Sequence, residues 1–432
     1  MVNTTTSPRP SPSPADPTSR ARAWPRVDGD RLWRSLMELA RIGATPKGGV
    51  CRLALTALDG EARDLFVRWA REAGCTVRVD AIGNIFARRA GRDDTLPPVM
   101  TGSHIDTQPT GGKFDGNYGV LAGLEVLRSL DDAGIVTEAP LEVAVWTNEE
   151  GSRFVPVMMG SGVFADAFTL DHALAQRDAQ GVSVADALAA IGYAGATGVT
   201  PPVGAYFEAH IEQGPVLEAH DRVIGVVQGA LGQRWYDVTV QGMEAHAGPT
   251  PMALRRDALL TASALVAEVN RIALDHAPHG RGTVGVLEVF PASRNVIPGS
   301  VRMTVDLRAA DDAVLLAMDA ALRATCERLG TAGRTPIAVE QVVYFPPQPF
   351  DPALVDGVRD DARALGYTAM DVVSGAGHDA VYLARLAPTA MIFVPCADGI
   401  SHNEIEDARP EHLEAGCNVL LHGMLRSAEV AA

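Results

Sequence analysis

Three short polar segments follow runs of apolar residues that are expected to form strands. They comprise residues 102–106 (Gly-Ser-His-Ile-Asp), 114–116 (Phe-Asp-Gly) and 148–151 (Asn-Glu-Glu-Gly). Together they supply a histidine, two aspartates and two adjacent glutamates. A hydrolase uses such side chains to hold divalent cations while one carboxylate stays free as a base. The sequence therefore predicts a metal-dependent hydrolytic site where these strands end.

The first segment places His104 two residues before Asp106. Alternate residues of a strand point to the same face, so we expect the two side chains to point together. A carboxylate beside an imidazole fixes its tautomer for metal binding. A single pair of this kind is more often an ordinary pair of polar loop residues, but the other acidic segments weaken that alternative.

The acidic residues of the other two segments suggest distinct roles. Asp115 stands at a glycine-rich turn before a predicted helix, where it is either a plain N-cap or a bridge between two cations about 3.5 to 4 Å apart. Glu149 and Glu150 are neighbours, so one can bind metal while the other faces the attacking water. Paired acids on an exposed helix are usually only solvated, but these two follow an apolar strand.

Two further histidines could complete a ligand set. His210 lies in the alternating segment 206–215, and His402 lies in the polar segment 399–404. Mixed nitrogen and oxygen ligands suit zinc, manganese, cobalt or nickel. The residue types do not choose among these metals.

A second polar group lies elsewhere in the chain and consists of His246, Asn295 and Arg308. Each residue alone is more typical of a turn or a surface. As a set they could bind a substrate, because arginine grips a carboxylate through two hydrogen bonds and asparagine and histidine donate to a carbonyl or an oxyanion.

A glycine pattern at residues 375–380 resembles a dinucleotide-binding fingerprint, since it follows a possible strand and opens a helix. His378 and Asp379 crowd the expected phosphate turn, and nothing upstream forms the required unit. We therefore favour a glycine that lets the backbone approach another ligand, with Gly377 as a candidate substrate contact.

Length and composition limit the remaining possibilities. A chain of 432 residues predicts two domains. A net charge of −16 argues against nucleic acid and anionic membranes as partners. There is no apolar run of about 18 to 20 residues and no signal peptide, so we expect a cytoplasmic protein. Five scattered cysteines without a C-x-x-C pair predict reduced thiols rather than disulfides or metal ligands.

The order of predicted elements divides the chain into four parts. Residues 1–25 are rich in serine and proline and predict a disordered tail. Residues 26–230 and 346–432 alternate strands and helices, which predicts an α/β catalytic domain with a central, mostly parallel sheet. Residues 231–345 follow a β-α-β-β-α-β order, which predicts an inserted ferredoxin-like α+β lid or dimerisation domain.

These motifs, in this order, resemble the amidase, hydantoinase and carbamoylase branch of the di-zinc aminoacylase-like metallopeptidases. The resemblance extends from about residue 28 to the end of the chain and depends on segments 102–109, 112–116, 119–126, 146–151, 210–215, 374–379 and 401–403. It implies a di-metal, aminopeptidase-like catalytic domain. It also implies a homodimer that forms through the inserted domain.

The resemblance assigns a role to each candidate residue. One metal ion, most readily zinc, is held by His104, Asp115 and His210, and a second by Asp115, Glu150 and His402. The general base is Glu149, with Asp106 as the partner of His104 behind the metal. Substrate is bound by Gln213, Asn295 and Arg308, and His246 reaches across a dimer interface to polarise the scissile carbonyl. Gly377 stays a candidate substrate contact from its glycine pattern alone.

The implied reaction is hydrolysis of the carbamoyl C–N bond of an N-carbamoyl amino acid, which releases the amino acid, ammonia and carbon dioxide. N-carbamoyl-β-alanine, the substrate of a β-ureidopropionase in pyrimidine degradation, is the leading expectation, beside N-carbamoyl-L-amino acids. Two alternatives stay open: an allantoate or ureidoglycine-type amidohydrolase of the same branch and, more distantly, a non-catalytic binding homologue.

Overall fold

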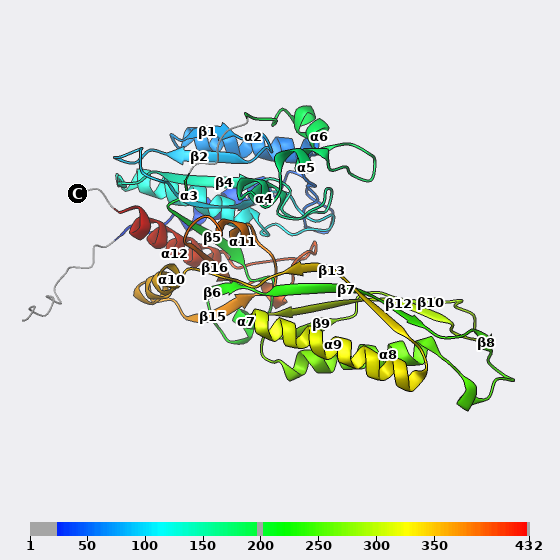
Figure 1. Cartoon of the computed structure of the whole chain (residues 1–432). Helices are drawn as coiled ribbons and strands as arrows, with labels where there is room; N and C mark the ends of the chain where they lie inside the picture. Colours follow the sequence, from blue (N-terminus) through cyan, green and yellow to red (C-terminus); the bar gives the residue numbers. More distant parts are fainter. Residues whose placement is uncertain (1–23, 197–201, 430–432) are drawn as a thin grey trace, which may run out of the picture.

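Two large β-sheets organise the chain, and each has its own apolar core (Figure 1). The computed structural model describes residues 24–196 and 202–429, so the predicted tail lies almost wholly outside the described residues. We call the nine-stranded sheet with its helices the first lobe. Residues 232–345 form the second lobe, which projects from the first as an elongated arm (Figure 1).

The first-lobe sheet is mixed, with strand order β1-β2-β4-β3-β5-β16-β6-β14 and with β15 also paired to β6. Its four central strands, β4, β3, β5 and β16, are parallel, but most flanking pairs are antiparallel. The prediction of a mostly parallel sheet thus holds for the centre only. The strands are β1 (Thr76–Val79), β2 (Ile85–Arg89), β3 (Val99–His104), β4 (Leu141–Trp146), β5 (Ala205–Ile211), β6 (Ile224–Ala230), β14 (Gln348–Pro349), β15 (Ala369–Ser374) and β16 (Thr389–Val394).

Helices cover both faces of this sheet, and every residue of the four central strands is buried. Such strands read as continuous apolar runs because neither face meets water. The longer helices are α1 (Gly29–Leu39), α2 (Ala57–Glu72), α3 (Asn117–Asp132), α10 (Pro352–Ala364) and α12 (Pro410–Ala428). The shorter ones are α4 (Met159–Phe164), α5 (Leu170–Ala175), α6 (Val184–Ile191), α7 (Val216–Ala219) and α11 (Asp379–Leu383).

The starts of the first two helices depend on local capping. The side chain of Asp28 accepts the N–H of Arg31 at the start of α1. At the start of α2, Thr56 accepts the N–H of Asp59, and the Asp59 carboxylate accepts the N–H of Leu55 in return. This reciprocal pair satisfies two backbone donors that the helix itself leaves unpaired.

The second lobe follows the β-α-β-β-α-β order expected of a ferredoxin-like domain with one difference. The strand expected after the first helix is divided into two short strands, β9 and β10, which both pair with β12. Two helices pack on its antiparallel sheet, whose strand order is β10-β12-β7-β13, with β9 also paired to β12. Residues of β7 alternate between buried and more exposed positions, as in a sheet with one covered face. The elements are β7 (Gly232–Gln241), α8 (Ala258–Asp275), β9 (Arg281–Thr283), β10 (Leu287–Phe290), β12 (Ser300–Ala309), α9 (Asp312–Gly333) and β13 (Ile337–Phe345).

The chain passes between the sheets at two neighbouring places. Strand β6 ends at Ala230 in the first sheet, and β7 begins at Gly232 in the second. After β13 ends at Phe345, strand β14 returns and pairs with β6. The sheets therefore change close to residues 231 and 345, although the division into separate folding domains stays a prediction.

No helix in the described part of the chain has the length and apolar character to cross a membrane. All five cysteines are free thiols, and four of them are buried.

Candidate metal centre

The candidate ligands meet where the central parallel strands end. Strand β3 ends at His104, β5 carries His210 next to its last residue, and Glu149 and Glu150 follow β4. Asp115 precedes α3, and His402 follows β16. Parallel strands present their carboxyl ends at the same edge of a sheet, so side chains from remote parts of the sequence are brought together there.

One group of potential ligands is fully inside the first lobe. The Nε2 atom of His210 lies 3.2 Å from Oδ1 of Asp115, and the Nε2 atom of His104 lies 3.7 Å from the same oxygen. All three residues are buried. Gly116 allows this approach, since its φ is +65° and a Cβ atom there would lie 2.4 Å from the His104 ring.

A second group uses the other oxygen of Asp115. The Nε2 atom of His402 lies 3.2 Å from Oδ2 of Asp115 and 3.4 Å from Oε2 of Glu150. Gln108 holds Glu150 in place, because its backbone N–H and its side-chain amide each donate to one carboxylate oxygen, at 3.1 and 2.7 Å. Asp115 thus offers one oxygen to each group, which is the arrangement needed to bridge two cations.

Glu149 belongs to neither ligand group, although its Oε2 atom lies 3.5 Å from Nε2 of His104. Burial, together with the nearby Asp379 and Glu150 carboxylates, raises the pKa of Glu149 well above its ordinary value. A buried carboxylate with a strong affinity for a proton, next to a ligand cluster, suits a general base.

Asp106 supports the site in a different way from the one predicted. Its backbone carbonyl accepts from Nδ1 of His104 at 2.9 Å, but its carboxylate lies 4.0 Å from that nitrogen. The carboxylate instead accepts the backbone N–H groups of Glu149 and Glu150, both at 3.3 Å. Since β3 ends at His104, strand alternation no longer sets the direction of the Asp106 side chain. Asp106 therefore positions the acidic pair.

The ionisation of the histidines follows from burial and from Asp115. Burial lowers the pKa of His104 to about 4. Burial also acts to lower the pKa of His210, but the hydrogen-bonded Asp115 carboxylate outweighs it and raises the pKa to about 9. The Asp115 carboxylate likewise raises the pKa of His402 to about 9. The cluster thus attracts positive charge, which a divalent cation would supply in place of protons.

Two of the predicted substrate contacts lie in the first lobe. The Gln213 amide donates to Oδ2 of Asp115 at 2.9 Å and to Ser401 Oγ at 3.2 Å, so it reaches the ligand cluster. Gly377 lines a cavity of about 360 Å³ together with Arg308, which comes from β12 of the second lobe. Arg308 donates from Nη1 to the Gly375 carbonyl at 2.7 Å and also pairs with Asp306.

The structure does not bring His246 and Asn295 to the ligand cluster within one chain. His246 is in β8 (Ala245–His246), which pairs with β11 (Val296–Ile297), and Asn295 directly precedes β11. Both residues are exposed, and β8 lies at the far end of the second lobe (Figure 1).

Comparison with known proteins agrees with this geometry. Residues 100–426 match the model of the family described as Peptidase family M20/M25/M40. The chain belongs to this family. A curated relative from Rhizobium meliloti, named N-carbamoyl-L-amino-acid amidohydrolase, is 49% identical over 410 residues, which are 94% of this chain and 98% of the relative.

A solved structure from Burkholderia multivorans, described as an amidase of the hydantoinase/carbamoylase family, is 63% identical. It superposes with a TM-score of 0.91 over 93% of this chain and 98% of its own. A curated allantoate amidohydrolase from Bacillus subtilis is 35% identical over 88% of this chain and 93% of its own length. The resemblance to the hydantoinase and carbamoylase branch and the predicted α/β fold class are therefore confirmed.

In this M20/M25/M40 chain the donor set fits a pair of divalent cations. Histidine nitrogens and carboxylate oxygens are the ligands that borderline transition metals prefer. A third group formed by Glu208, His210 and His378 also has ligand atoms close together. Glu208 accepts from Ser103 Oγ at 2.8 Å and from the Ala380 N–H at 2.9 Å, and its charge helps to raise the pKa of His210.

Glu406 is a buried carboxylate that supports the site and was not predicted from the sequence. Glu406 accepts the backbone N–H groups of Phe114 and Asp115, at 2.9 and 3.1 Å, and the hydroxyl of Ser401 at 2.8 Å. It therefore fixes the backbone of the bridging aspartate. Its position four residues after His402, in the same polar loop, was the available signal.

Proposed function

We propose that this protein is a metal-dependent amidohydrolase that cleaves the carbamoyl C–N bond of N-carbamoyl amino acids. The observation that carries the proposal is Glu149, a buried free carboxylate beside two ligand groups that share Asp115. The N-carbamoyl-L-amino-acid amidohydrolase from Rhizobium meliloti is 49% identical over nearly the whole chain. Its name supports the carbamoyl C–N bond as the bond that is cleaved. The products are the amino acid, ammonia and carbon dioxide.

Two divalent cations, with zinc as the first candidate, would occupy the ligand groups. One is held by His104, Asp115 and His210, and the other by Asp115, Glu150 and His402. When bound, such cations lower the pKa of water and polarise a carbonyl oxygen.

The side chains of this protein perform the proton transfers. Glu149 takes the proton of the attacking water and returns it to the departing nitrogen. Asp106 keeps Glu149 in place through the backbone, so the base does not swing away from the ligand cluster. Arg308 binds the substrate carboxylate, while Gln213 and the backbone at Gly377 border the bound molecule.

The cavity beside Arg308 favours substrates that carry an apolar side chain. Its lining includes Met158, Leu231, Phe345 and Tyr382. The backbone N–H of Met158 donates to the carbonyl of Glu149, so the cavity adjoins the base. N-carbamoyl-β-alanine has no side chain to fill this space. We therefore place N-carbamoyl-L-amino acids first and N-carbamoyl-β-alanine second.

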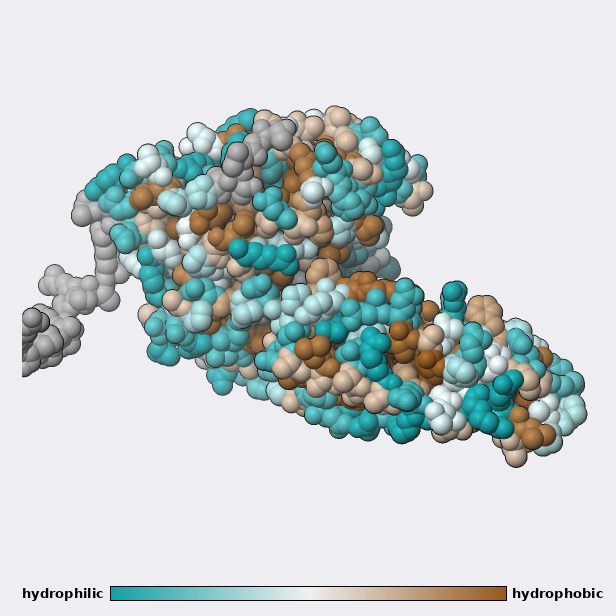
Figure 2. All heavy atoms as spheres, in the orientation of Figure 1, coloured by the Kyte–Doolittle hydropathy of each residue, from teal (hydrophilic) through white to brown (hydrophobic). Residues whose placement is uncertain are grey.

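We also propose that two copies of the chain complete each site. His246 and Asn295 are exposed on the second lobe and face no ligand cluster of their own chain. Apolar side chains reach the surface along this lobe (Figure 2), among them Met252, Leu254 and Leu260. A homodimer through the second lobe would cover such side chains and bring His246 to the scissile carbonyl of the partner.

Ammonia release with three substrate classes tests the proposed function. The metal-loaded protein should hydrolyse N-carbamoyl-L-amino acids with large apolar side chains faster than N-carbamoyl-β-alanine or allantoate. Allantoate is included as a substrate because a relative at 35% identity is named allantoate amidohydrolase. Faster turnover of allantoate would replace the proposed substrate, and binding of all three without turnover would indicate a non-catalytic homologue.

A further inference from the structure

Arg52 is fully buried, and no ion pair within the described ranges includes it. Its side chain donates to four neutral acceptors instead. Nε donates to the carbonyl of Ile105 at 2.7 Å, and Nη1 to the carbonyls of Leu39 and Ile42 at 3.1 and 2.8 Å. Nη2 donates to Oδ1 of Asn117 at 2.5 Å.

Two of these acceptors belong to the loops that carry candidate metal ligands. Ile105 lies between His104 and Asp106. Asn117 is the first residue of α3, and its Nδ2 atom donates to the backbone carbonyl of Asp115 at 3.1 Å. The guanidinium thus joins two ligand-bearing loops that lie far apart from Arg52 in the sequence.

The other two acceptors are the carbonyl of Leu39, the last residue of α1, and that of Ile42, in the turn that follows the helix. Carbonyls at the carboxyl end of a helix lack partners within the helix and carry the negative end of its dipole. Burial lowers the pKa of Arg52 to about 10, so the side chain still carries its charge at neutral pH. The carbonyls of Leu39 and Ile42 therefore fix the guanidinium between the two loops, and the charges of Asp59 and Asp106 favour its protonated form.

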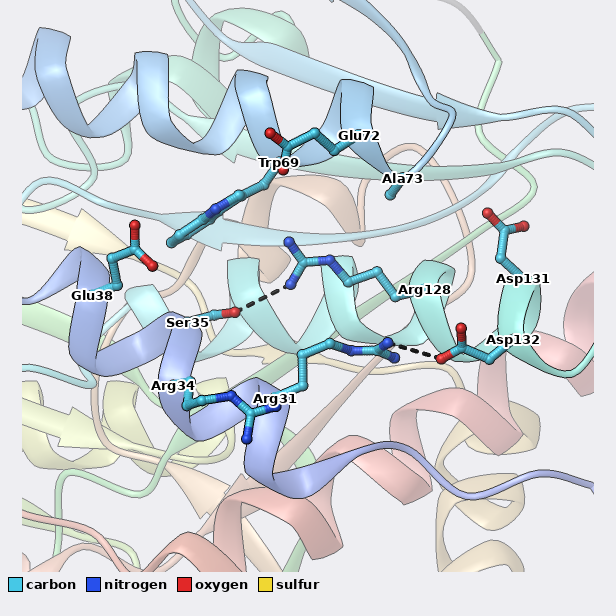
Figure 3. A pocket seen from close by; sticks show the side chains of 10 residues that line it. All are labelled: Arg31, Arg34, Ser35, Glu38, Trp69, Glu72, Ala73, Arg128, Asp131 and Asp132. Carbon is cyan, nitrogen blue, oxygen red and sulfur yellow. Dashed lines mark hydrogen bonds and ion pairs between the residues drawn. The ribbon is translucent and has the colours of Figure 1, made fainter.

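Helix α1 is also attached to α3 by contacts that do not involve the ligand loops (Figure 3). Arg31 pairs with Asp132 at 2.8 Å and with the buried Glu125 at 2.7 Å, and Arg128 donates to Ser35 Oγ at 3.1 Å. These contacts provide a matched comparison, because they attach α1 to α3 ahead of the carboxyl end that Arg52 contacts and include no candidate metal ligand.

We propose that Arg52 is a positioning residue that sets the distance between His104 and Asp115 by holding the peptide at Ile105 and the start of α3 against the end of α1. The proposal rests on the metal-dependent function given above. Only the planar fork of arginine presents donors in all of these directions, since lysine has one nitrogen and three donors.

Chelator competition with zinc and no substrate present tests the proposal. Arg52→Lys should weaken the tighter of the two zinc sites by about 10 to 100-fold, the range typical of groups that orient metal ligands. With cobalt in place of zinc, the visible absorption spectrum of the variant should differ from that of the wild type. In turnover assays kcat should fall while KM is unchanged, because Arg52 lies behind the ligands.

The control is Arg31→Gln, which should lower the thermal midpoint but leave zinc affinity within about twofold of the wild type. Zinc affinity unchanged in Arg52→Lys would overturn the proposal, as would an equal loss in Arg31→Gln. If Arg52→Lys does not fold, a second variant is Asn117→Ala, which removes the link to Asp115 and keeps the other three hydrogen bonds of Arg52. Unchanged zinc affinity in Asn117→Ala would also overturn the proposal.

The zinc measurement separates this proposal from the proposed substrate. A wild-type protein that binds two zinc ions but hydrolyses no N-carbamoyl amino acid would contradict the proposed function and leave the Arg52 comparison intact. A wild-type protein that binds no zinc would contradict both.

Discussion

The two lobes present their candidate residues in opposite ways. In the first lobe, His104, Asp115 and His210 are buried and linked through a single carboxylate. In the second lobe, His246 and Asn295 are exposed, and they lie at the end of an arm rather than in a cluster. The first set therefore comes together within one chain, whereas the second set lies away from that cluster.

The difference suggests separate roles for the buried residues of the first lobe and the exposed residues of the second lobe. Burial and hydrogen bonding fix His104, Asp115 and His210 without any bound cation, which would limit the reorganisation needed on metal binding. Among the other candidate ligands, His402 is exposed. Exposed residues on a projecting lobe can approach and leave a substrate, so they suit a contact made only when the site closes. Substitutions in the two lobes should accordingly have different signatures.

The largest effect is expected for Glu149→Gln. The amide cannot accept a proton, so kcat should fall by about 10² to 10⁴-fold, the usual contribution of a general base, while both metal ions stay bound. The matched variant Glu150→Gln should instead lose metal, since Glu150 belongs to a ligand group. Metal analysis and steady-state kinetics on both variants check the pair. Full activity of Glu149→Gln would remove it from the mechanism.

His246→Ala should lower kcat by about 10² to 10³-fold, as expected for loss of one group that stabilises an oxyanion. Mixing it with Glu149→Gln tests whether sites are shared. A mixed dimer has one site with both wild-type residues, so random exchange should restore about a quarter of wild-type activity. Absence of recovery after proven subunit exchange would show that His246 does not act in the site of the partner chain.

Arg308→Lys should raise KM about tenfold for substrates with a carboxylate, since lysine cannot form the two parallel bonds of arginine. Arg302→Lys is the control, because Arg302 is an exposed residue of the same strand and does not line the cavity with Gly377. If the wild type binds carbamoyl compounds with and without a carboxylate equally well, Arg308 does not recognise the substrate carboxylate.

The smallest effect is the pH dependence of the metal-free protein. His210 and His402 have pKa values raised to about 9, above the ordinary value, so their contribution to stability is full below about pH 6.5 and is lost as pH rises through about 9. The thermal midpoint should therefore fall by a few degrees over this range. The increase in thermal midpoint that zinc causes should become larger over the same pH range, because zinc no longer competes with protons for the histidines.

Replacement of His402 by asparagine should flatten this profile, and His279→Asn, an exposed change in the second lobe, should not. A metal-free midpoint that rises between pH 6.5 and pH 9 would contradict the assigned ionisation.

The sequence predicted well whatever depends on regular elements. Apolar runs that end in polar residues located β3 and β4. The order of elements in the second lobe follows from the same periodicities, except that one expected strand is divided into β9 and β10. These features are set by local pattern, which the sequence shows directly. The assignment of Asp115 and His104 to the same metal ion came from the family resemblance and not from a local pattern.

Features that depend on the end of an element or on a remote contact were not predictable in this way. Asp106 lies beyond the last residue of β3, so its carboxylate turned toward Glu149 and Glu150 rather than His104. Gly116, and not Asp115, is the residue that caps α3. The partners of Arg52 are defined only when three segments fold together, and nothing in its local sequence distinguishes it from a surface arginine.

Metal content tests the central claim most directly. The wild-type protein, loaded with zinc and freed of excess, should contain two zinc ions per chain, and Asp115→Asn should lose tight binding at both positions because each ligand group uses this carboxylate. Zinc bound at less than one ion per wild-type chain, or two ions retained by Asp115→Asn, would contradict the shared centre.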